Sequence, residues 1–412
     1  MRFLHLADLH FGKSLHGLSL LESGDQAAWT DRFLELAGQL RPDAVVIAGD
    51  VYDRGSPSGE AVSLLSRLLT ALAEQEIPVL MVAGNHDSAQ RLAFARQLLA
   101  KQRLYISAAP GKGPELSHVT LTDAHGPVTF WLMPYVYPAL IAQLLGEESA
   151  RDYDGAVRAL LAAQPVDFGQ RNVLVAHQNV TANGKEAQRG GSESMVGGVG
   201  QIDYHAFDGF DYVALGHIHA AFPVGRPTVR YAGSPLCYHF DELRQRAKGP
   251  LLVELGEKGT EPSVTLLPIA PLHPMRAEAG DYESLRAAEA ARQAGGEYLS
   301  LTLTDRRVTP EISADLRGLL EAKGSVLMEL NSSWQAEAGA ATLSATALDE
   351  SGLAELFTGF YTQRCRGEAP DAPSLALLQK GAELAERADF RLPPSEREIE
   401  QLLALALKEG QI

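Results

Sequence analysis

The sequence predicts an α/β fold in which polar residues follow the carboxyl ends of the strands. Five hydrophobic runs have the length and β-branched content of strands, at residues 2–7, 43–49, 77–84, 172–176 and 211–216. Apolar residues at helical spacing separate the first of these runs, at residues 26–40, 60–73 and 88–100. Such alternation of strands and helices implies parallel βαβ units.

The next segment is richer in strands. After Leu104, strand-like runs occupy residues 119–122 and 128–133. We therefore expect two packed sheets with helices on their outer faces, which makes a four-layer α/β/β/α sandwich over residues 1–268.

Each of the five runs leads into residues of metal-ligand type. These residues are Asp8, His10, Asp50, Asn85, His177, His217 and His219. In open α/β sheets, ligands bind beyond the carboxyl ends of the strands, so we expect the seven side chains to lie at one edge. Seven donors exceed the needs of one tetrahedral ion. They suit two adjacent ions that share a bridging carboxylate.

The motifs differ in how specific they are. Asp-x-His and Gly-Asp pairs at strand ends are common in solvated loops and turns, so Asp8 and Asp50 alone would indicate little. The Gly-Asn-His-Asp segment that ends at Asp87 is more specific, because glycine permits a tight turn and a neutral Asn offers a carbonyl oxygen. His217 and His219 fall on the same side of an extended segment. Together, after successive strands, these motifs favour a metal centre over coincidence.

Composition restricts the class of protein. The 412 residues suffice for two or three domains, and the longest apolar stretches are far too short to cross a bilayer. Cys237 and Cys365 cannot form a disulfide framework, and the first residues already have the pattern of a strand, not of a signal peptide. We expect a cytoplasmic protein without a membrane segment. The net charge of −16 argues against a general nucleic-acid coat protein but not against a nuclease, because bound cations add local positive charge.

The composition changes in the last third of the chain. Residues 269–334 predict a small capping α/β domain, with helical patterns at 282–293 and 311–322 and strand patterns at 298–304 and 326–330. Residues 335–412 predict a linker and a helical tail with apolar faces. Such a tail either docks on a partner or folds back on its own chain.

The five motifs resemble those of the calcineurin-like metallophosphoesterases. Longer segments around them are similar to the nuclease subunits of the bacterial SbcCD complex: residues 8–13, 49–53, 192–198 and 207–219. Most archaeal and eukaryotic break-repair relatives carry His where this chain has Asp53.

The resemblance implies a ligand set and catalytic roles. Asp8, His10, Asp50 and His219 would hold one ion, and Asp50, Asn85, His177 and His217 would hold the second. Mixed carboxylate, amide and imidazole ligands favour manganese, although iron and zinc are compatible with them. His86 would contact the scissile phosphate or protonate the leaving oxygen, and either Asp53 or Asp87 would orient it. We prefer Asp53.

The resemblance also implies an activity and partners. The activity is 3′→5′ exonuclease on duplex DNA with endonuclease on single strands and hairpins, in DNA end processing, replication and repair. The expected partner is an SbcC-type ATPase with a coiled coil, bound by a nuclease homodimer in a heterotetramer. The alternatives are a phosphatase or cyclic-nucleotide phosphodiesterase on the same scaffold, and a metal-free scaffold protein.

Overall fold

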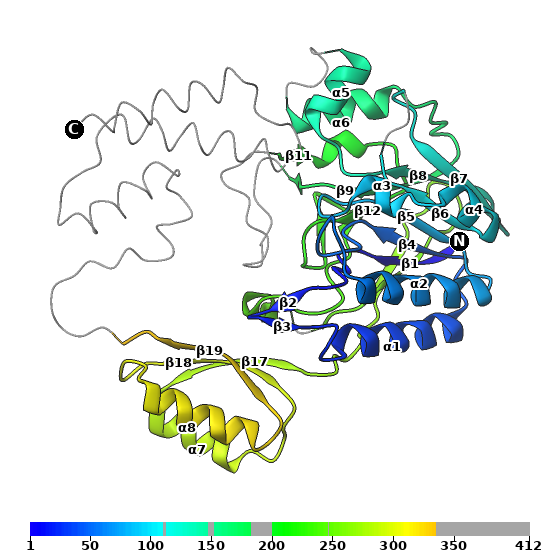
Figure 1. Ribbon diagram of the computed structural model, residues 1–412. Helices are drawn as coiled ribbons and strands as arrows, with labels where there is room; N and C mark the ends of the chain where they lie inside the picture. Colours follow the sequence, from blue (N-terminus) through cyan, green and yellow to red (C-terminus); the bar gives the residue numbers. More distant parts are fainter. Residues whose placement is uncertain (110–112, 147–151, 183–199, 246, 335–412) are drawn as a thin grey trace, which may run out of the picture. The chain divides into compact units, whose positions relative to one another are not determined.

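The computed structural model describes residues 1–109, 113–146, 152–182, 200–245 and 247–334. Two six-stranded sheets dominate this part of the chain (Figure 1). The first has the order β16-β15-β1-β4-β5-β6, from Ser263–Leu266, Leu251–Glu254, Arg2–Leu6, Ala44–Ala48, Val79–Val82 and Leu104–Ser107. The second has the order β13-β14-β12-β9-β8-β7, from Phe222–Val224, Arg226–Tyr231, Tyr212–Gly216, Arg171–His177, Gly126–Met133 and Ser117–Asp123. The strands that precede the motifs are parallel within each sheet.

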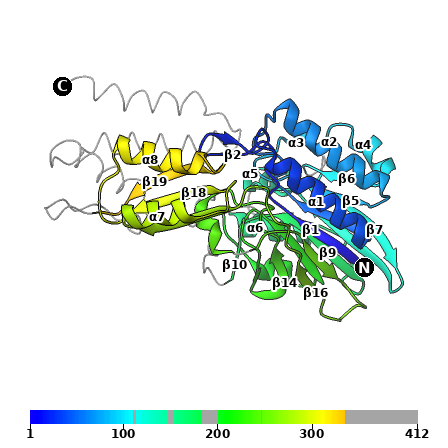
Figure 2. The same cartoon turned by 90° about the horizontal axis from the view of Figure 1, so that it is seen from below.

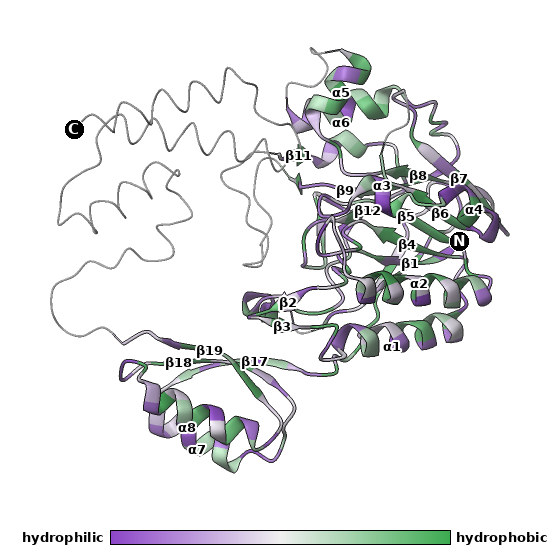
Figure 3. Cartoon of the chain, viewed as in Figure 1, coloured by the Kyte–Doolittle hydropathy of each residue, from purple (hydrophilic) through white to green (hydrophobic). Residues whose placement is uncertain are grey.

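The two sheets enclose a common hydrophobic core. Phe3 of β1 packs edge-on against Phe130 of β8 and Tyr212 of β12, with ring centroids 5.4 and 5.7 Å apart. All three side chains are fully buried, and β4 and β5 are predominantly hydrophobic (Figure 3). Strands that are buried on both faces explain why the predicted runs are continuously apolar instead of alternating.

Helices cover the outer face of each sheet. α1 (Asp25–Leu40) and α2 (Gly59–Glu74) share a buried cluster with the first sheet, and α5 (Pro138–Leu145) and α6 (Tyr153–Ala162) share another with the second. α2 begins where the Ser58 side chain accepts a hydrogen bond from the backbone N–H of Ala61, and it buries Leu65, Leu68 and Leu72. The expected α/β fold is confirmed.

The predicted helix over residues 88–100 is wrong. The structure has two short helices there, α3 (Ala89–Leu92) and α4 (Arg96–Leu99). Ala95 adopts the left-handed conformation, with φ 56°, which ends the first helical segment before the second begins. The apolar spacing persists across this break, so periodicity alone did not reveal it.

A small α/β unit follows β16 in the chain. Three parallel strands, β17 (Met275–Gly280), β18 (Tyr298–Leu303) and β19 (Val326–Ser332), carry α7 (Tyr282–Ala291) and α8 (Pro310–Glu321) on one face (Figure 2). Its own core includes Leu299, Leu301 and Leu316. β17 was not expected, because its sequence Met-Arg-Ala-Glu-Ala-Gly lacks β-branched residues.

The tail predicted over residues 335–412 lies outside the described residues. Within the described part of the chain, no helix is long and apolar enough to span a bilayer.

Candidate metal centre

The carboxyl ends of five strands from both sheets meet at one place. β1 leads to Asp8 and His10, β4 to Asp50, and β5 to Asn85, whereas β9 ends at His177 and β12 leads to His217 and His219. All of these side chains are buried except those of Asn85 and His217, which are partly exposed. The structure thus gathers all seven predicted residues.

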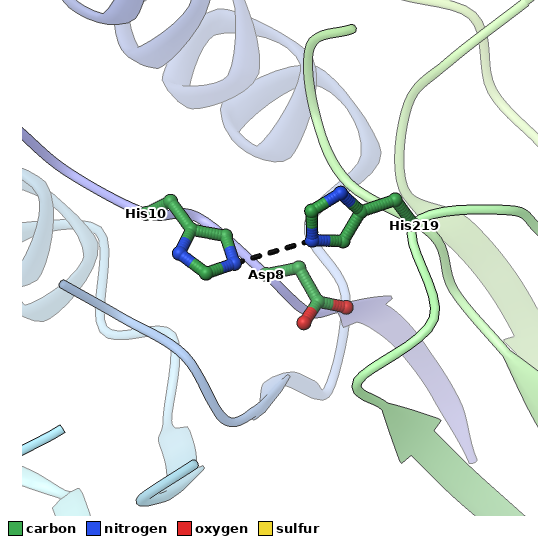
Figure 4. Close-up of side chains that lie close together, drawn as sticks. All are labelled: Asp8, His10 and His219. Atoms are coloured by element: carbon green, nitrogen blue, oxygen red, sulfur yellow. Dashed lines mark hydrogen bonds between the residues drawn. The ribbon is translucent and has the colours of Figure 1, made fainter. Parts of the chain in front are cut away.

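One group of donors comes from β1 and the segment after β12. One ligand atom from each of Asp8, His10 and His219 lies within 4.8 Å of the others (Figure 4). The Nε2 atoms of His10 and His219 are 3.2 Å apart. The Nδ1 atom of His219 faces a carboxylate oxygen of Glu242 at 3.0 Å, and a carboxylate only accepts. A neutral His219 ring therefore keeps its proton on Nδ1 and presents the Nε2 lone pair to His10.

A second group surrounds the side-chain oxygen of Asn85. Asn85 Oδ1 lies 3.2 Å from His177 Nε2 and 3.2 Å from His217 Nδ1. Asp50 connects the two groups, because its Oδ2 lies 3.2 Å from His177 Nε2 and 3.6 Å from His10 Nε2. Carboxylate, amide and imidazole donors that converge in this way fit divalent cations.

Burial and mutual charge shift the titration of these groups. Burial lowers the pKa of His10 well below its usual value and that of His217 to about 3. Burial opposes charge on His177 too, but the Asp50 carboxylate outweighs it and raises the pKa of His177 to about 9. Burial would raise the pKa of Asp50, yet the charge of His177 holds it well below its usual range. Each of these two groups thus favours charge on the other, and a cation held by them would compensate the Asp50 carboxylate in the same way.

Comparison with known proteins agrees with this geometry. A sequence model of the calcineurin-like phosphoesterase family matches residues 1–221. The chain belongs to this family. A second model, described as the type 5 capsule protein repressor C-terminal domain, matches residues 271–364. Two similar proteins are named as D subunits of nuclease SbcCD. The one from Staphylococcus epidermidis is 31% identical over 288 residues, which cover 69% of this chain and 74% of the relative. The one from Staphylococcus saprophyticus is 32% identical over 286 residues, which cover 69% and 73%.

The backbone of this phosphoesterase is strained at several of the seven positions. Asp8, His10, Asp50 and His217 have positive φ angles of 54°, 42°, 47° and 104°. Each such non-glycine conformation costs on the order of 1–3 kcal/mol and clusters at functional sites. Two backbone hydrogen bonds of 3.0 Å hold the strained loops together, from Asp8 N to Gly49 O and from His10 N to Asp50 O. These backbone conformations direct the donor side chains that follow neighbouring strands toward the same candidate metal centre.

The motif glycines make room for these side chains. A Cβ atom at Gly84 would stand 2.1 Å from Asp50 Oδ1, and one at Gly49 would stand 2.3 Å from His177 Nδ1. At Gly216, the Cβ would approach the backbone oxygen of Ala48 to 1.9 Å. The sequence indicated only that glycine permits a tight turn at residue 84. The structure adds that any side chain there would displace Asp50.

His86 reaches the same place from a more open position. Its side chain is 42% exposed, and its Nε2 lies 4.0 Å from Asp50 Oδ2. Its Nδ1 lies 3.0 Å from the backbone oxygen of Asp53, so Nδ1 donates and Nε2 faces the group of ligands. The Asp53 carboxylate lies instead 2.9 Å from Lys13 Nζ and 3.6 Å from His10 Nδ1. Asp53 therefore contacts His86 through its main chain.

Two further carboxylates beside the site are buried, those of Asp87 and Glu242. The sequence offered Asp87 only as the alternative to Asp53 for orienting His86, and it gave Glu242 no role. The Asp87 side chain accepts hydrogen bonds from the backbone N–H groups of Gly84, Val51 and Tyr52 at 2.9 to 3.1 Å, which ties the β4 loop to the β5 loop. The Asp87 carboxylate thus stabilises the main chain of the two loops and does not orient His86. Glu242, the second carboxylate, contacts His219 from a 3₁₀ helix at Phe240–Arg244. No spacing in the sequence marks Glu242, because 22 residues separate it from the last motif and only folding brings it back.

Proposed function

We propose that this phosphoesterase is a two-metal DNA nuclease. The observation that carries the proposal is the position of Asp50, whose Oδ2 faces an imidazole nitrogen of each group, His10 at 3.6 Å and His177 at 3.2 Å. Under this proposal Asp50 would contribute to holding both of two divalent ions, for which manganese would suit the mixed donors. The first ion would be held by Asp8, His10 and His219, and the second by Asn85, His177 and His217.

The residues around the bridge have distinct tasks in phosphodiester hydrolysis. When bound, the two ions would activate a water and stabilise the attacking and leaving oxygens of an in-line displacement. His86 is exposed enough to meet a phosphodiester, and its Nε2 faces the ligands because the Asp53 carbonyl holds Nδ1. We assign to His86 the transfer of a proton to the leaving 3′-oxygen. Asp53 acts on it from the main chain.

The names of the relatives support the proposed substrate and partners. Both relatives are named as D subunits of nuclease SbcCD, so we propose that this chain cleaves DNA together with an SbcC-type coiled-coil ATPase. The proposed activities are 3′→5′ exonuclease on duplex ends and endonuclease on single strands and hairpins, in the cytoplasm. Residues 1–268 would form the nuclease domain, 269–334 a cap, and 335–412 the ATPase-binding tail. Two nuclease chains would pair within a heterotetramer.

Labelled DNA tests the proposal against a phosphatase or cyclic-nucleotide phosphodiesterase. We expect end-labelled hairpin and duplex DNA to be cleaved with Mn²⁺ and not with excess chelator, and cleavage to change when the ATPase partner is added. Asp50→Asn should abolish cleavage, whereas Asp31→Asn, at a 59% exposed side chain paired with Arg67, should leave it intact. Release of phosphate from phosphoproteins or cyclic nucleotides without DNA cleavage would reject the nuclease and favour the alternative.

A further inference from the structure

A buried ion pair lies directly behind His219. Glu242 and Lys248 have side chains only 3% and 7% exposed, and Lys248 Nζ donates to Glu242 Oε2 at 2.6 Å. Glu242 uses its other oxygen, Oε1, for the Nδ1 atom of His219 at 3.0 Å. The carboxylate therefore stands between an ammonium that can only donate and an imidazole nitrogen that must donate to it.

The same lysine also holds the main chain of His219. Lys248 Nζ donates to the backbone oxygen of His219 at 2.9 Å and to Ser234 Oγ at 2.7 Å. The backbone N–H of Ser234 donates to that same His219 oxygen at 3.0 Å. One connected hydrogen-bond network thus binds both the ring and the backbone of His219, and it lies on the side of the ring away from His10.

Stability alone does not account for such a network. Removing two charges from water costs several kcal/mol per ion, and a buried pair often stabilises a fold no better than apolar side chains of similar volume. The hydrogen bond from Nδ1, in contrast, has a definite chemical effect. It confines the ring proton to Nδ1 and leaves the Nε2 lone pair aimed at His10 Nε2, 3.2 Å away.

We propose that Glu242 is a positioning residue that fixes the Nδ1–H tautomer of His219 and aims Nε2 at a divalent cation, and that Lys248 fixes Glu242. The proposal deepens the proposed function, because it concerns how one of the two ions is held. Carboxylate partners of this kind orient ligand imidazoles and raise their basicity.

The chemistry of the amide group gives a sharp test. In Glu242→Gln, the amide oxygen must face Lys248, which has only donors, so the amide NH₂ turns toward His219. A donor at that place forces His219 to carry its proton on Nε2, where it blocks the cation. In the double variant Glu242→Gln with Lys248→Met, the amide is free to turn its oxygen back to His219. The double variant therefore restores the tautomer although it lacks both charges.

Two readouts follow the tautomer and the cation separately. Imidazole nitrogen shifts in ¹⁵N-histidine-labelled, metal-free protein report the tautomer, with the His219 resonance assigned by a His219→Gln variant. Titration of metal-free protein with Mn²⁺ by calorimetry reports affinity. We expect Glu242→Gln to move the His219 proton to Nε2 and to weaken one Mn²⁺ binding step by about 10- to 100-fold, the range for partners of ligand histidines. The double variant should recover most of that loss.

Glu254→Gln serves as the matched control, because that side chain is 51% exposed and pairs only with Arg2 and Ser263 among the described residues. The proposal is overturned if Glu242→Gln keeps the wild-type tautomer, or if the double variant binds Mn²⁺ as weakly as the single variant. Wild-type protein that shows the Nδ1–H tautomer but neither binds Mn²⁺ nor cleaves DNA would refute the proposed function instead.

Discussion

Gly84→Ala is the substitution for which the structure predicts the clearest loss of activity. Its added Cβ would stand 2.1 Å from Asp50 Oδ1 and 2.4 Å from Asp50 N, whereas ordinary contact begins at 3.4 Å. The neighbours are a buried carboxylate and main chain, so the Cβ fits only if Asp50 shifts. Overpacking of this kind costs about 1–3 kcal/mol of stability. A shift of about 1 Å in a positioned group can lower the rate about 100-fold.

The assay compares Mn²⁺-dependent DNA cleavage, Mn²⁺ binding and thermal unfolding of Gly84→Ala with those of Gly59→Ala. Gly59 is a helical residue whose added Cβ would meet nothing within 4 Å. The Gly59→Ala control should therefore keep full activity, and its free energy of unfolding should rise by about 0.4–1 kcal/mol. We expect Gly84→Ala to remain folded while cleavage falls by about 100-fold or more. Folded Gly84→Ala protein with wild-type cleavage and wild-type Mn²⁺ affinity would refute the steric argument.

Three further predictions concern the proton donor, the dimer and the tail. His86→Ala should keep both Mn²⁺ binding steps in calorimetry and lose about 10²–10⁴-fold in cleavage rate, whereas loss of metal would make His86 a ligand. The apolar side chains of Phe94 and Leu98 are 81% and 65% exposed, so Phe94→Glu combined with Leu98→Glu should dissociate a dimer in light scattering. The control Val308→Ser, at a 37% exposed side chain in the small unit, should leave the dimer intact. A monomeric wild-type protein at micromolar concentration would contradict the dimer. Truncation after Trp334 should abolish co-purification with the ATPase partner but leave cleavage of single strands, and unchanged affinity for the ATPase would show that the tail is not the docking element.

The sequence was sufficient for the five strands that lead to the site and for the gathering of the seven donors. The ends of these strands agree with the predicted runs to within about two residues for β1, β4, β5, β9 and β12. Continuous apolar runs of this length are typical of strands that are buried on both faces. The carboxyl ends of parallel strands then bring their polar residues to one edge.

What could not be predicted depends on contacts between distant residues. Glu242 reaches His219 only after β13, β14 and the 3₁₀ helix have folded back, and Asp53 turned out to meet His86 with its carbonyl and not its carboxylate. The break at Ala95 depends on a backbone conformation that alanine rarely adopts, so neither propensity nor periodicity signals it.

The donor set also depends on how the two sheets pack against each other. His177 belongs to β9 of the second sheet, yet its Nδ1 lies 2.7 Å from the backbone oxygen of Ala48 in β4 of the first, and this contact aims its Nε2 at Asp50. Gly216 of β12 permits that approach, because a Cβ there would collide with the same Ala48 oxygen at 1.9 Å. The distance between Asp50 and His177 is therefore set by the spacing of the sheets, which is fixed by the core around Phe3 and Phe130. A substitution in this core such as Phe3→Leu should thus weaken Mn²⁺ binding, measured by calorimetry, as well as stability, since both sheets must keep their spacing for the two halves of the donor set to meet.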